Sequence, residues 1–149
     1  MTSGARRLLM IIAVLAVTGV VISSLSLVHH YGASRSSFCD LSETLNCDVV
    51  NRSEYSTLLG VPVALIGVLG YLALLVLATL YRRRRETPKL LFWGAMAGLG
   101  FALYLTYIEG FVLATWCVLC LSSLCTIFTI ALLSFALTAI STRNSVTPP

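Results

Sequence analysis

Cysteines are the residues of this sequence best suited to chemistry, and four of the five form two pairs. Cys39 and Cys47 lie in the polar stretch SRSSFCDLSETLNCDVVNRSEYSTLLGVP, whereas Cys117 and Cys120 form a C-x-x-C motif in the apolar stretch TWCVLCLSSLC. If that stretch is helical, residues three apart share a face, so the two sulfurs of the motif can meet. One thiol of such a motif commonly has a lowered pKa and attacks other disulfides. The pattern therefore indicates thiol–disulfide exchange.

The cysteines allow three other interpretations. Four thiolates could hold a zinc ion, but zinc knuckles carry two short C-x2–4-C pairs and this chain has one, so we expect no metal. A structural disulfide between Cys39 and Cys47 would stabilise the loop by about 2–3 kcal/mol. It would leave Cys117 and Cys120 unexplained, since a bond across one helical turn constrains little. Cys125 is interpreted as a packed small hydrophobe.

The composition predicts that lipid surrounds most of the chain. Of the 149 residues, 58% are hydrophobic and 11% are charged, and the mean hydropathy is +0.93. A soluble domain carries about 25% charged residues. We expect an all-α polytopic membrane protein, a four-transmembrane-helix bundle forming one domain (1–149), with the first helix uncleaved because its apolar run exceeds that of a signal peptide. The expected helices are 8–28, 61–81, 90–108 and 111–138, with a long outer loop at 29–60 and a tight turn at Glu109 and Gly110.

Basic residues predict the orientation. Eight of the ten Lys and Arg fall in the two tails and the second connection, which the positive-inside rule assigns to the cytoplasm. Both termini are then cytoplasmic, and the cysteine pairs lie on the outer side, where disulfides persist. The net charge of +4 is therefore a topology signal, and we expect no nucleic-acid partner. These eight residues are Arg6, Arg7, Arg82, Arg83, Arg84, Arg85, Lys89 and Arg143.

A membrane dithiol needs a partner that takes or gives two electrons. A lipid-soluble quinone suits a dithiol at bilayer depth, and the 29-residue loop 29–57 can reach up to ~100 Å when extended, enough to fold over the last helix. Chemistry alone therefore predicts a membrane dithiol oxidoreductase. A scaffold stapled by outer-loop disulfides is the alternative of another class.

The combination of C-x7-C, N-R-S, G-V-P and W-C-x2-C resembles the vitamin K epoxide reductase family and its prokaryotic homologues. The stretch YLTYIEGFVLATWCVLC also resembles the last helix of that family, so the likeness covers nearly the whole chain. The resemblance implies an enzyme, a disulfide:quinone oxidoreductase that supports disulfide bond formation. Its substrate would be ubiquinone, menaquinone or vitamin K.

The same resemblance implies a role for each site residue. Cys117 and Cys120 would be the catalytic pair, with Cys120 next to the quinone. Cys47 would relay electrons through a transient disulfide with Cys117, and Cys39 would exchange with a thioredoxin-like partner on the outer side. The quinone-binding residues, besides Cys120, are expected to be Ser53 and Trp116.

The sequence also departs from the animal members of the family. Leu124 stands where these enzymes carry a tyrosine, and the second helix lacks their quinone-binding asparagine. Both departures favour prokaryotic homologues over a vitamin K quinone or epoxide reductase, which is the alternative enzyme. We expect a bacterial inner-membrane protein without a fused thioredoxin domain, whose partner is a separate protein.

Overall fold

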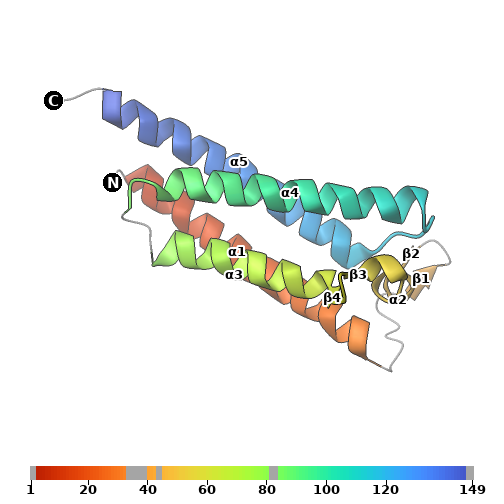
Figure 1. Ribbon diagram of the computed structural model, residues 1–149. Coiled ribbons are helices and arrows are strands. Elements are labelled where there is room, and N and C mark those ends of the chain that lie inside the picture. The colour runs from red at the N-terminus through yellow and green to blue at the C-terminus, as the bar shows by residue number, and fades with distance from the viewer. Residues whose placement is uncertain (1–2, 33–39, 43–44, 81–83, 147–149) are drawn as a thin grey trace.

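Four long helices dominate the computed structural model, which describes residues 3–32, 40–42, 45–80 and 84–146. The start of α1, the end of α3 and the end of α5 lie at one end of the bundle (Figure 1). Helix α1 packs on α3 and α5, and α4 packs on α5. The all-α bundle expected from the sequence is confirmed. Its long helices are α1 (Ser3–Tyr31), α3 (Val63–Thr79), α4 (Thr87–Phe111) and α5 (Val118–Val146).

The surface of the bundle is suited to lipid. Within the described residues, α1, α4 and α5 are each long and apolar enough to cross a membrane, and α3 is a shorter apolar helix of 17 residues. Large apolar side chains point outward, with Met10 67%, Trp93 70% and Phe135 61% exposed. Such exposure is costly in water and normal against acyl chains.

Small residues let the helices approach closely. A Cβ atom added to Gly19 of α1 would lie 2.3 Å from ring atoms of Tyr71 on α3. The hydroxyl of Tyr71 in turn donates to the backbone oxygen of Ser123 on α5, at 2.9 Å. Small side chains at helix interfaces commonly allow this kind of packing in membranes, where there is no hydrophobic force between helices. Gly19 and Tyr71 therefore link α1, α3 and α5 through one close contact and one hydrogen bond.

The connection between α1 and α3 is built of short elements at the other end of the bundle (Figure 1). Strands β1 and β2 are antiparallel, and so are β3 and β4, whose two-residue turn is formed by Leu59 and Gly60, both with positive φ. The elements are β1 (Asp40–Ser42), β2 (Leu45–Asn46), α2 (Cys47–Asn51), the 3-10 turn η1 (Glu54–Ser56), β3 (Thr57–Leu58) and β4 (Val61–Pro62).

The turn expected at Glu109 and Gly110 is wrong. Helix α4 continues through both residues to Phe111, and the backbone N–H of Val112 still donates to the Ile108 oxygen at 2.9 Å. The chain leaves the helical path at Ala114, whose φ is 48°. Glycine is tolerated inside membrane-spanning helices when the backbone groups keep their hydrogen-bond partners, as they do here. Residues 112–117 therefore form the connection, and α5 begins seven residues later than expected, at Val118.

Candidate active site

Three of the cysteines meet where the α1–α3 connection covers the start of α5. Cys47 opens α2, Cys117 immediately precedes α5, and Cys120 lies in its first turn. Cys47 and Cys117 are both fully buried and share one small apolar cluster with Val50, against which Cys120 packs. Cys47 is disulfide-bonded, whereas Cys117 and Cys120 are free thiols. The structure therefore brings together a disulfide-bonded cysteine and two free thiols from two distant parts of the chain.

The other two cysteines lie elsewhere. Cys39 lies outside the described residues. Cys125 is a free, exposed thiol on α5. The prediction that Cys125 is packed inside the bundle is therefore wrong.

Backbone contacts hold the α2 segment against the residues before α5. Leu45 and Trp116 form an isolated parallel bridge, and the N–H of Asn46 donates to the Trp116 oxygen at 3.2 Å. The Asn46 side chain also caps α2, since its Oδ1 accepts from the N–H groups of Asp48 and Val49 at 3.0 and 3.2 Å. The residue before Cys47 thus starts the short helix and attaches it to the residue before Cys117.

Asn51, at the other end of α2, links the two cysteine segments directly. Its side chain is 4% exposed. The amide nitrogen donates to the Cys47 backbone oxygen at 2.9 Å and lies 3.8 Å from the sulfur of Cys117. An N–H group directed at sulfur favours the thiolate form of that sulfur.

The last turn of α1 supports α2 from the opposite side. His30 Nδ1 donates to the backbone oxygen of Asn51, and His29 Nδ1 lies 3.4 Å from a carboxylate oxygen of Asp48. The guanidinium of Arg52 donates to the backbone oxygen of Gly32. The α2 segment is therefore fixed by the ends of two transmembrane helices, which compensates for its shortness.

Glu109 is an acidic residue buried beside the C-x-x-C motif. Its side chain is 2% exposed, and Oε2 accepts a hydrogen bond from the N–H of Cys117 at 3.1 Å. The other oxygen, Oε1, is buried without a hydrogen-bond partner among the described residues. Sequence reasoning placed Glu109 in a turn and missed this contact. The signal was present, because an acid in an apolar segment is commonly functional.

The surroundings of Cys117 favour its ionised form. The Cys120 thiol, hydrogen-bonded to the Cys117 sulfur, lowers the pKa of Cys117, and the backbone amides of Leu119 and Cys120 act in the same direction. Burial and the Glu109 carboxylate oppose this shift without cancelling it. A lowered pKa gives more thiolate, the species that attacks disulfides.

A cavity of about 360 Å³ opens beside Cys120, between α3 and α4 and over parts of α1 and α5. Its wall is mainly apolar and rich in glycine, with a few polar groups, of which Ser23 and Ser26 on α1, Asn51 and Tyr71 are examples. Cavities of this size, with few polar groups, commonly hold small organic ligands. Its glycines are Gly67, Gly70, Gly94 and Gly98.

The two remaining expected quinone residues lie close to the thiols but not in this wall. Ser53 borders a second cavity of about 30 Å³ together with Cys120 and Glu109, and its hydroxyl donates to the Val50 oxygen at 2.8 Å. The ring of Trp116 lies against Gly110. Within the described residues no group of three or more His, Cys, Asp or Glu side chains is arranged to hold a metal ion.

The profile of the vitamin K epoxide reductase family matches residues 10–135. The chain belongs to the vitamin K epoxide reductase family. Members of this family are membrane redox enzymes of quinone and disulfide chemistry, so the protein is a membrane oxidoreductase. Comparison with individually curated proteins finds no match.

Proposed function

We propose that the protein passes electrons from a reduced thioredoxin-like protein to a membrane quinone and thereby supports disulfide bond formation. One observation carries the proposal: Cys47 and Cys117 are buried in a common cluster, while Cys120, one helical turn further, lines the 360 Å³ cavity. A scaffold would need neither the buried sulfur pair nor a cavity beside a free thiol.

The proposed electron route uses all four paired cysteines, and the common cluster of Cys47 and Cys117 supports its exchange step. The partner's dithiol reduces a Cys39–Cys47 disulfide, and the Cys47 thiolate then attacks Cys117 of a Cys117–Cys120 disulfide, releasing Cys120. Cys39 resolves the Cys47–Cys117 bond and leaves Cys117 and Cys120 reduced. These two thiols give two electrons and two protons to the quinone, which forms a quinol as their disulfide closes.

We propose that the quinone binds in this cavity. The quinone ring would lie beside Cys120, and an apolar tail would follow the glycine-lined space between α3 and α4. Asn51 borders this cavity as well, so the loop supplies an amide where the second transmembrane helix has none. Ser53 and Trp116 would flank the ring from the loop side. Ubiquinone, menaquinone and vitamin K are the candidate substrates.

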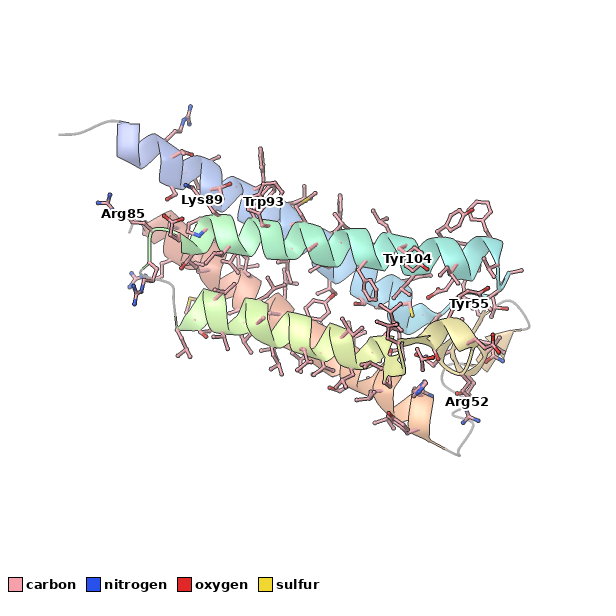
Figure 2. The ribbon with its side chains drawn as sticks, viewed as in Figure 1. Arg52, Tyr55, Arg85, Lys89, Trp93 and Tyr104 are labelled. Atoms are coloured by element: carbon pink, nitrogen blue, oxygen red, sulfur yellow. The ribbon has the colours of Figure 1, made fainter. Side chains whose placement is uncertain are left out.

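The sidedness of the site is also a proposal. Arg85 and Lys89 lie at the end of the bundle opposite Arg52 (Figure 2). Arg52 directly follows α2, the short helix that Cys47 opens. If basic ends face the cytoplasm, the thiols lie on the outer side of a bacterial inner membrane, where a thioredoxin-like partner can reach them.

The test is quinone reduction in membranes supplied with a reduced thioredoxin-like protein. We expect Cys117→Ala and Cys120→Ala each to abolish quinol formation, because each removes one sulfur of the disulfide that must close. Cys125→Ala is the matched control and should retain activity, since Cys125 is exposed and outside the cluster. Unchanged turnover in both active-site variants would refute the proposal.

A further inference from the structure

Glu109 is the only charged residue among the buried side chains of the described part of the chain. Burying a carboxylate costs several kcal/mol unless hydrogen bonds or opposite charges compensate for lost water. Glu109 receives a hydrogen bond from the N–H of Cys117 to Oε2, and the Cys120 thiol lies within hydrogen-bonding reach of the same carboxylate. A side chain needed only as an acceptor for that N–H could be neutral, so the second oxygen requires its own explanation.

The position of the second oxygen supplies one. Oε1 is buried with no hydrogen-bond partner among the described residues, and Glu109 borders the cavity of about 30 Å³ that Cys120 also borders. A space of this size has room for about one water molecule. Cys120 also lines the 360 Å³ cavity, so it lies between the Glu109 carboxylate and the proposed quinone-binding site.

The chemistry at Cys120 requires a group of this kind. Oxidising two thiols by a quinone releases two protons at the sulfurs and consumes two at the quinone oxygens. Cys120 is in the first turn of α5 and is half-buried, away from bulk water. Without a nearby acceptor, its proton would have to leave through apolar surroundings.

We propose that Glu109 is the proton-transfer residue of quinone reduction. Its Oε1 accepts the proton of the Cys120 thiol, directly or through one water molecule, and delivers it to a quinone oxygen. The Cys117–Cys120 disulfide forms as the two sulfurs give two electrons to the quinone. The second proton of the quinol is the one released at the Cys117 sulfur, and Glu109 returns to its starting state. This role rests on the proposed function, since it assigns a residue to the same reaction.

Glu109→Gln separates proton transfer from structure, because glutamine retains an oxygen for the Cys117 N–H and nearly the same shape. We expect quinone reduction to fall at least about 100-fold, the usual contribution of general acid–base catalysis. Its rate should also lose the pH dependence that Glu109 provides. Thiol exchange from the partner through Cys47 to Cys117, followed by alkylation and gel shift, should stay within about twofold.

Two features keep this experiment interpretable. Among the residues that the structure describes, the other titratable groups around Glu109 are Cys117 and Cys120 on the α5 side and Tyr55 on the loop side, and all three remain in the variant. Glu54→Gln is the matched control, because Glu54 is an exposed acid next to Tyr55 in the loop. This variant should behave as the wild type.

Infrared difference spectra on quinone reduction give a readout that a structural role would not move. We expect a carboxylic acid band in the wild type and in Glu54→Gln that is absent in Glu109→Gln. If Glu109→Gln does not fold, Glu109→Asp should fold, react more slowly and keep both the band and the pH dependence; their loss there would overturn the proposal. An unchanged rate and pH profile in Glu109→Gln, with an active wild type, refutes this role alone. A wild type that reduces no quinone refutes the proposed function and this role together.

Discussion

The contact between Cys47 and Cys117 can be tested by forcing the two sulfurs to react with each other. In a variant carrying Cys39→Ala, Cys120→Ala and Cys125→Ala, Cys47 and Cys117 remain as the only cysteines. Their neighbours Asn46 and Trp116 are joined by a backbone hydrogen bond of 3.2 Å. Adjacent strands lie about 5 Å apart, which is within the Cα separation of most disulfides. We expect a Cys47–Cys117 disulfide to form on mild oxidation.

The separation of the two residues along the chain sets the size of the effect. The new bond closes a loop of about 70 residues, which in the chain-entropy estimate stabilises the folded state by about 4 kcal/mol. For a chain of this length, that corresponds to a rise in Tm of about 10 °C. The comparison is made within one variant, oxidised against reduced, so the substitutions themselves cancel.

The assay combines non-reducing electrophoresis after alkylation with thermal unfolding in detergent. A variant that retains only Cys47 and Cys125 is the control, because Cys125 is exposed and lies outside the cluster of Cys47 and Cys117. The control should form no intramolecular bond and show the same Tm in both redox states. Equal cross-linking in the two variants, or none in either, would refute the reasoning that the fold presents Cys47 to Cys117.

Two further predictions concern the cavity and the loop. Gly70→Leu places a side chain in the 360 Å³ cavity, where an added Cβ meets no atom within 4 Å. This variant should raise the KM for quinone about tenfold or more while thiol exchange is retained. Gly100→Leu, at an equally open position outside the cavity wall, should leave the KM unchanged, and equal effects of the two variants would exclude this quinone-binding site. Leu59→Asn should raise Tm in detergent by about 2–4 °C, because Leu59 is 98% exposed and has a φ of 53° in the β3–β4 turn. Asparagine adopts this conformation at a cost about 1 kcal/mol lower than leucine does, so an unchanged Tm would contradict the prediction.

Much of the fold was predictable because lipid leaves few choices. Apolar segments of about 20 residues must become helices, since no water is present to satisfy their backbone groups. The bundle was therefore correctly predicted, and the cysteine motifs correctly predicted the family. The bounds were less predictable, and Glu109 and Gly110 show why. A glycine and an acid signal a turn in a soluble protein, but here the acid is held by the Cys117 N–H and the helix continues to Phe111.

The site was predictable in its cysteines and not in what surrounds them. Spacing shows that Cys117 and Cys120 are close, but it carries no information on Asn51, which reaches Cys117 across 66 residues of sequence. The cavity is equally hidden, because it arises where the glycines of two helices face each other. The pairing of Cys39, the roles of Ser53 and Trp116, and the electron route stay predictions.

The arrangement of the loop explains how a five-residue helix can hold Cys47, the proposed relay cysteine, in a fixed position. Helix α2 is too short to be stable alone, so its position depends on His30 of α1 and on Trp116 before α5. These anchors lie at the end of α1 and just before the start of α5, and the bundle therefore fixes the spacing of Cys47 and Cys117. Fixing the thiols through helix ends leaves the face of α5 that carries Cys120 open toward the cavity. A single end of the bundle thus has room for both proposed reactions, with disulfide exchange on one side of the C-x-x-C motif and quinone reduction on the other.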